Sequence, residues 1–140
     1  MSMHRMLPRT AAGWTIAIFG AMAALFGAVG LIAPGVVLDS MGFDALEGQG
    51  RVFLAASSMA SLNMGVYYLV AAATEWRPFF RFTVPFRLLT LAVFSSLVIF
   101  DVAPASFLGV ALWEGAGAVA TGLGLAYDRG AFGARQAISR

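Results

Sequence analysis

Cysteine and lysine are absent from this 140-residue sequence, and histidine occurs once, as His4. Without cysteine the chain has no disulfide, no thiol redox chemistry and no iron–sulfur ligation. Because no histidine lies within the apolar segments, neither a haem site nor a catalytic zinc site is expected. The few carboxylates are too scattered to hold a harder cation. We therefore expect neither a metal nor a cofactor.

Charge is also scarce. Charged residues make up 11% of the chain and apolar residues 60%, against roughly 25% and 45–50% in soluble proteins. So little charge cannot cover a water-exposed surface, and lipid is the expected partner. The net charge of +2, with no basic stripe interleaved with aromatic residues, excludes nucleic-acid binding.

Four apolar stretches are long enough to cross a bilayer, since a helix of about 20 residues spans roughly 30 Å of hydrocarbon. They run approximately from Gly13 to Ala33, Val52 to Thr74, Phe79 to Phe100 and Ala105 to Tyr127. Backbone groups in lipid must be paired within their own segment, so each stretch is predicted to be a helix. The predicted fold is all-α: one domain over residues 1–140, an integral membrane four-helix bundle with antiparallel up-down topology.

Arginine is distributed unevenly between the connections. Seven of the nine arginines fall in the two tails and in the connection after the second span: Arg5, Arg9, Arg77, Arg81, Arg129, Arg135 and Arg140. The other two connections are mainly acidic. Because positive residues stay on the cytoplasmic side, both termini are predicted to be cytoplasmic. Trp14, Trp76 and Tyr127 then fall at the cytoplasmic interface, where amphipathic rings are enriched.

Glycines recur at heptad spacing in the first and last spans. The first span carries Gly13, Gly20 and Gly27, and the last carries two such pairs, Gly115 with Gly122 and Gly117 with Gly124. Helices in lipid associate through close van der Waals contact, for which small residues are needed. The repeats favour packing within the chain over a dimer face. In the third span, Pro85 is expected in the first turns, where its missing N–H costs little.

Glu114 and Arg87 are the charged residues expected deepest in the membrane. Glu114 lies about nine residues, or 14 Å, into the fourth span. A charge at that depth costs at least about 2.5–3.5 kcal/mol, so it indicates a functional site. Arg87 lies in the antiparallel third span at a similar level and is its expected partner, unless its side chain reaches the cytoplasmic interface. Both are candidate catalytic residues.

Uncharged polar and aromatic residues supply candidate ligand contacts. We expect a pocket around Glu114 that opens to lipid or toward the outer surface. Its predicted ligand-binding residues are Asn63, Tyr67, Trp113, Ser61 and Thr90. A membrane-buried asparagine needs a partner on another helix or on a ligand, whereas the serine is also typical of helix packing.

The sequence resembles the BphX-like proteins, small four-helix membrane proteins named for an open reading frame in biphenyl-degradation operons. The resemblance rests on residues 67–73 (YYLVAAA), on residues 77–84 (RPFFRFTV) followed by Arg87-Leu88-Leu89, and on Ala33-Pro34 followed by Gly42. An acidic residue in the fourth span also fits. That family has no assigned reaction. The resemblance therefore implies the fold and the topology. We expect the chain to be a multi-pass protein of the bacterial cytoplasmic (inner) membrane.

Three functions are compatible with these residues. The first is a bundle that binds a lipophilic small molecule or lipid, alone, as a homo-oligomer or with a partner membrane protein. The second is a membrane-embedded isomerase or cyclase, with Glu114 as general acid or base. The third is a proton-coupled exporter working as an oligomer, like the small multidrug-resistance proteins. These carry their intramembrane glutamate in span one, which has no acidic residue here.

Overall fold

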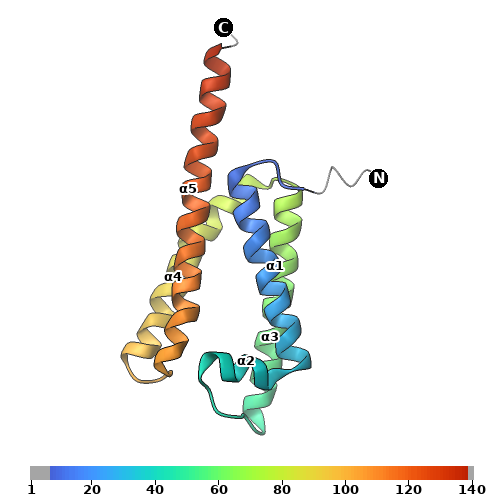
Figure 1. The fold of residues 1–140 in the computed structure, drawn as a ribbon, viewed down its shortest axis with the longest axis vertical. Coiled ribbons are helices and arrows are strands. Elements are labelled where there is room, and N and C mark those ends of the chain that lie inside the picture. The colour runs from blue at the N-terminus through green and yellow to red at the C-terminus, as the bar shows by residue number, and fades with distance from the viewer. Residues whose placement is uncertain (1–6, 139–140) are drawn as a thin grey trace.

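The structure, a computed structural model, describes the backbone of residues 7–138 and the side chains of residues 7–131. Within that part of the chain the regular secondary structure is all helical, without strands (Figure 1). The helices α1 (Ala11–Ile32), α3 (Gln49–Ala73), α4 (Arg77–Ile99) and α5 (Leu108–Ile138) are long and apolar enough to cross a membrane. The predicted all-α bundle of four membrane-spanning helices is confirmed.

Two details of the spans differ from the prediction. The last helix continues to Ile138, eleven residues beyond the expected Tyr127, and in Figure 1 it extends well past the start of α1. Pro85 is not in the first turns, because α4 already begins at Arg77, with Pro78 in its first turn. Pro85 is therefore inside the helix, where the carbonyl of Arg81 loses its usual hydrogen-bond donor.

The four long helices form two hairpins, α1 with α3 and α4 with α5 (Figure 1). The hairpins meet mainly through α1 and α5, while α4 makes few contacts with α1 or α3. Glycines bring α1 and α3 together: Gly20 and Gly27 of α1 lie against the backbone of α3, and Gly65 of α3 lies against the backbone of α1. The predicted packing of the first glycine stripe within the chain is confirmed.

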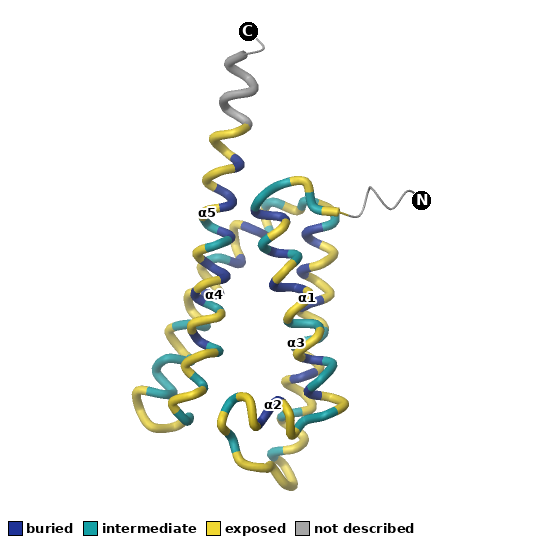
Figure 2. Tube along the Cα trace, viewed as in Figure 1, coloured by how far each residue is buried: buried dark blue, intermediate teal, exposed yellow. Residues whose placement is uncertain are grey.

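Most of the helical surface is exposed, and buried positions face inward (Figure 2). In an apolar 18-residue stretch of each span, the buried share of residues is 39% in the fourth span and 11% in the third. Apolar side chains cover the rest, including Ile32, Phe53 and Phe100, which are 73–85% exposed. Such a surface is stable only against lipid, as expected for a multi-pass membrane protein.

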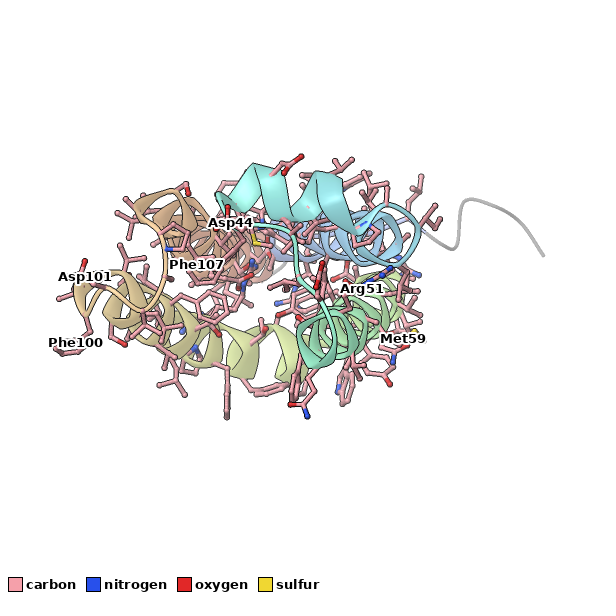
Figure 3. The ribbon with its side chains drawn as sticks, turned by 90° about the horizontal axis from the view of Figure 1, so that it is seen from below. Asp44, Arg51, Met59, Phe100, Asp101 and Phe107 are labelled. Carbon is pink, nitrogen blue, oxygen red and sulfur yellow. The ribbon has the colours of Figure 1, made fainter. Side chains whose placement is uncertain are left out.

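The first and third connections close one end of the bundle. The first holds α2 (Pro34–Met41), which ends at Gly42 with a left-handed φ of 75°. The third ends in the 3₁₀ turn η2 (Ala105–Phe107). Ser106 Oγ donates to the carbonyl of Met41 at 2.8 Å, and the rings of Phe43 and Phe107 are 5.6 Å apart. Figure 3, seen from this end, shows Phe107 close to the connection that carries Asp44.

Two carboxylates hold the start of α1 at the opposite end. Asp128 of α5 accepts from the backbone N–H groups of Ala11 and Ala12, at 3.0 and 3.1 Å. Glu75, in the turn between α3 and α4, accepts from the N–H and the hydroxyl of Thr10, at 3.0 and 2.7 Å. The first N–H groups of a helix have no partner within the helix. The two carboxylates supply these partners from distant parts of the chain.

We expect Asp128→Ala to lower the free energy of unfolding by about 1–2 kcal/mol, the range for loss of a helix cap. The substitution removes the acceptors of two N–H groups, one of them buried and the other partly buried. Asp44→Ala is the matched control, because Asp44 is exposed in the first connection. Unfolding in detergent, followed by tryptophan fluorescence, measures both. Equal stability of the two variants would contradict the assignment.

Candidate functional site

Arg87 lies at the middle of α4, as the eleventh of its 23 residues. Phe80, Thr83 and Arg87 are the buried residues of this helix and form one stripe at spacings of three and four, so all three point into the bundle. The guanidinium lies against Gly117 of α5, where any Cβ atom would overlap it. The second glycine repeat of the fourth span therefore provides the space for a charged side chain.

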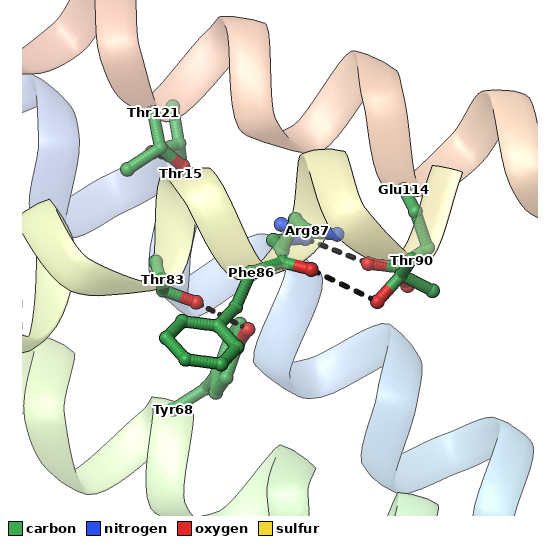
Figure 4. Close-up of polar contacts among 8 residues, drawn as sticks. All are labelled: Thr15, Tyr68, Thr83, Phe86, Arg87, Thr90, Glu114 and Thr121. Atoms are coloured by element: carbon green, nitrogen blue, oxygen red, sulfur yellow. Dashed lines mark hydrogen bonds and ion pairs between the residues drawn. The ribbon is translucent and has the colours of Figure 1, made fainter. Parts of the chain in front are cut away.

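Arg87 and Glu114 form a direct ion pair. Arg87 Nε donates to Glu114 Oε2 at 2.8 Å, drawn as a dashed line in Figure 4. The Arg87 side chain is 5% exposed and that of Glu114 is 26% exposed. The prediction that both face the interior within direct or water-bridged reach is confirmed, with a direct contact, and the alternative that Arg87 reaches the interface is wrong. Because α4 begins ten residues earlier, at Arg77, Arg87 is about 15 Å from the start of the helix.

Two aromatic rings of the α1–α3 hairpin lie beside the guanidinium. Its central carbon is 4.1 Å from the centroid of the Phe19 ring and 5.9 Å from that of Tyr68. Trp113, which precedes Glu114, packs on Phe19 with centroids 4.4 Å apart. A cation over an aromatic face is attracted by the ring quadrupole, more strongly where water is excluded. Arg87 thus joins the two hairpins at mid-height.

Hydroxyl pairs lie around the charged pair. Tyr68 Oη and Thr83 Oγ1 are 2.6 Å apart, and Thr15 Oγ1 and Thr121 Oγ1 are 3.1 Å apart (Figure 4). Each pair connects helices of different hairpins. Buried hydroxyls that satisfy each other add specificity to a bundle whose apolar contacts have little of it.

One donor of the pair has no acceptor. Arg87 Nη1 is buried and makes no hydrogen bond. A buried donor without a partner costs about 1–3 kcal/mol, more when it is charged. This unsatisfied group lies beside a carboxylate that is partly accessible.

Some of the predicted ligand-binding residues do lie near the pair. Trp113 is 40% exposed and borders it through Phe19. Thr90 is one turn from Arg87 on the same side of α4, is partly buried and donates to the carbonyl of Phe86. Ser61 has a packing role, because its hydroxyl donates to the carbonyl of Ala23 on α1 at 2.9 Å.

Asn63 and Tyr67 do not lie at the site, and the prediction that they line a pocket with Glu114 is wrong. Both are exposed on the outer face of α3. The orientation of α3 is determined by its buried residues, which include Gly65 and Tyr68 and pack on α1. Asn63 and Tyr67 are on the opposite side of that helix and are exposed.

Two surface hollows lie away from the pair. One, of about 450 Å³, is bounded by α2, the first connection and the start of α3, with Asp39, Glu47 and Arg51 among its lining residues. The other, of about 500 Å³, is an apolar groove between α1 and α3, lined by residues such as Trp14 and Val70. Within the described residues, no three His, Cys, Asp or Glu side chains are grouped so that they could hold a metal ion.

Sequence reasoning missed several residues of this arrangement. Phe19 and Tyr68 were not expected beside Arg87, and with aromatic residues at 13% of the chain nothing in the pattern distinguishes them. Glu75 and Asp128 were also missed. A signal for these two was present, since they are the only acidic residues in or beside the arginine-rich connections and tails.

Comparisons of the chain with protein-family models, with curated proteins and with solved structures find no match. The geometry around Arg87 and Glu114 is therefore the basis for a functional proposal.

Proposed function

We propose that this protein binds a lipophilic small molecule or lipid and holds its polar end at the Arg87–Glu114 pair. The observation that carries the proposal is the exposure of Glu114 on an otherwise buried face. Ala111 and Ala118, one turn away on either side, are 0% and 1% exposed, whereas the Glu114 side chain is 26% exposed. All three lie on the same side of α5 because they are three and four residues apart.

A carboxylate on an inward face is accessible only where the opposite helices stand apart. The hairpins fulfil this condition, since α4 makes few contacts with α1 or α3. They are joined at one end by Asp128 and the start of α1, and at the other by Ser106 and Met41. Between these two joints, a molecule reaches Glu114 laterally, from within the bilayer. A molecule arriving by that route has to be lipophilic.

Retention of a charged pair here also favours binding over a purely structural role. An apolar pair of similar volume is often as stable as a buried ion pair, or more so. Charged residues inside membranes commonly mark ligand or ion pathways. We also propose that the chain is related to the BphX-like proteins, a family with no assigned reaction.

Photolabelling with hexadecanol that carries a diazirine in its chain tests the proposal. In nanodiscs, we expect saturable labelling of α4 and α5 around residues 87–94 and 110–117. Thr90→Trp places a large ring one turn from Arg87 and should weaken labelling about tenfold or more, a loss of about 1.4 kcal/mol. Asn63→Trp adds the same ring on the lipid-facing side of α3 and should leave labelling unchanged. Non-saturable labelling, or equal effects of the two variants, would reject the proposal.

The same experiment distinguishes binding from catalysis. If the probe is recovered chemically altered, and Glu114→Gln abolishes that change, the pair acts on its ligand as an enzyme does. If the probe is recovered intact while Glu114→Gln lowers only its affinity, the protein is a binding module.

We further propose that both termini are cytoplasmic, in a bacterial inner membrane. Arg9, Arg77 and Arg129 are at the same end of the bundle, which supports this orientation. Because the chain has no cysteine, single cysteines can report it. A membrane-impermeant maleimide added to intact cells should label Asp44→Cys, and should label Thr74→Cys only after permeabilisation. The reverse pattern would invert the topology.

A further inference from the structure

The charge balance of the site restricts what its ligand can carry. Arg87 is the only charged residue between positions 82 and 100, and Glu114 is the only one between positions 102 and 127. The stretches 11–38 and 52–74 contain none. The middle of the bundle therefore has one positive and one negative charge, 2.8 Å apart, and a net charge of zero.

A charged head group is disfavoured at such a site. An ion near the pair is attracted by one of the two charges and repelled by the other, which lie 2.8 Å apart, so the two Coulomb terms oppose each other. The cost of taking the ion out of water remains, at several kcal/mol. An uncharged polar group has a far smaller desolvation cost, which one or two hydrogen bonds offset.

The hydrogen-bonding groups left over by the ion pair define the complementary head. Arg87 uses Nε for the pair, and its Nη1 has no acceptor. Glu114 accepts through Oε2, and a carboxylate has room for further donors. The site thus offers the two unpaired N–H groups of Nη1 and a carboxylate with free acceptor capacity. Nη1 has no exposed surface, so the guanidinium has to shift for an entering oxygen to reach it. That contact would satisfy a donor that is now costly.

We infer that the site selects lipids whose head is an uncharged hydroxyl, the simplest group that accepts from Arg87 and donates to Glu114 at one oxygen. This inference rests on the binding function proposed above. Its ligand class is that of membrane alcohols, such as long-chain alcohols and diacylglycerols, and it excludes permanently charged amphiphiles.

Three photoprobes with the same diazirine-bearing hexadecyl chain and different heads test this inference. The heads are a hydroxyl, a sulfonate and a trimethylammonium group, the last two charged at every pH used. With wild-type protein in nanodiscs, we expect the Kd from saturable labelling to be at least about tenfold lower for the alcohol than for either charged probe. This difference corresponds to about 1.4 kcal/mol. Equal or tighter labelling by a charged probe overturns the inference and leaves the binding function standing. Failure of all three probes to label saturably rejects the binding function itself.

Changing the charge of the site should change the ranking of the probes. In Glu114→Gln the guanidinium is uncompensated, so we expect the sulfonate to become the preferred probe. Asn63→Gln, on the outer face of α3, is the control and should keep the preference for the alcohol. An unchanged preference in folded Glu114→Gln would contradict the electrostatic basis. If that variant does not fold, the wild-type ranking alone decides.

Discussion

Replacing Glu114 by Gln is expected to lower the free energy of unfolding by about 3–5 kcal/mol, as for removal of one partner of a buried ion pair. The effect is large because Arg87 is 5% exposed and cannot recover its charge compensation from water. The rings of Phe19 and Tyr68 remain beside the guanidinium. Where water is excluded, the attraction between such a ring and a cation is about 2 kcal/mol, which is less than the expected loss.

The double variant Glu114→Gln with Arg87→Leu should recover much of that loss, because it leaves no uncompensated charge in the bundle. Asp44→Asn makes the same acid-to-amide change at an exposed position and should have almost no effect. Thermal and denaturant unfolding in detergent measure all three. A stability of Glu114→Gln close to that of the Asp44 control would show that the pair does not hold the bundle together.

Gly65→Ala is expected to destabilise the protein by about 1–3 kcal/mol, the usual cost of overpacking. A Cβ atom at Gly65 would overlap the backbone of Gly20 and Ala24 on α1. Backbone atoms cannot turn aside as a side chain can, so α1 and α3 would have to move apart. Between helices in lipid, close contact is the main source of attraction, and every contact near the crossing would weaken.

Gly122→Ala is the matched control for that prediction. Gly122 is also inside a helix, but nothing lies within 4 Å of the position of its Cβ atom. Alanine there should be neutral or should stabilise the protein by up to about 1 kcal/mol, as helix propensity predicts. Opposite signs for the two Gly→Ala changes, measured in the same detergent, are the expected result. A similar loss in both would indicate a general effect of helix propensity and not of packing.

The position of the charged pair could be predicted from the sequence because it depends on counting along helices. Arg87 and Glu114 lie in consecutive antiparallel spans, and a rise of 1.5 Å per residue brings them to about the same level. Two opposite charges at the same depth in lipid are expected to pair, because an unpaired charge there is costly. The shared depth follows from the bounds of the spans and does not depend on the rotation of the helices about their axes.

Rotation about the helix axis is what the sequence did not determine. In a soluble helix, polar residues mark the outward face, whereas in lipid both faces are apolar and the pattern indicates neither. Asn63 and Tyr67 were expected to face inward because they are polar. They face outward because Gly65 and Tyr68 occupy the contact with α1.

The sequence by itself determined that this chain forms four apolar helices, that they alternate in direction and that one charge pair lies between the last two. These follow from hydrophobic length, connection order and axial rise, all of which are local quantities. Only the tertiary structure decided which glycines are contact points, since Gly117 makes room for Arg87 while Gly122 faces open space. It also decided that Asp128 supports the start of α1 from a position more than a hundred residues away. Both depend on how far apart the hairpins stand and how each helix is rotated, which side-chain packing determines and periodicity does not.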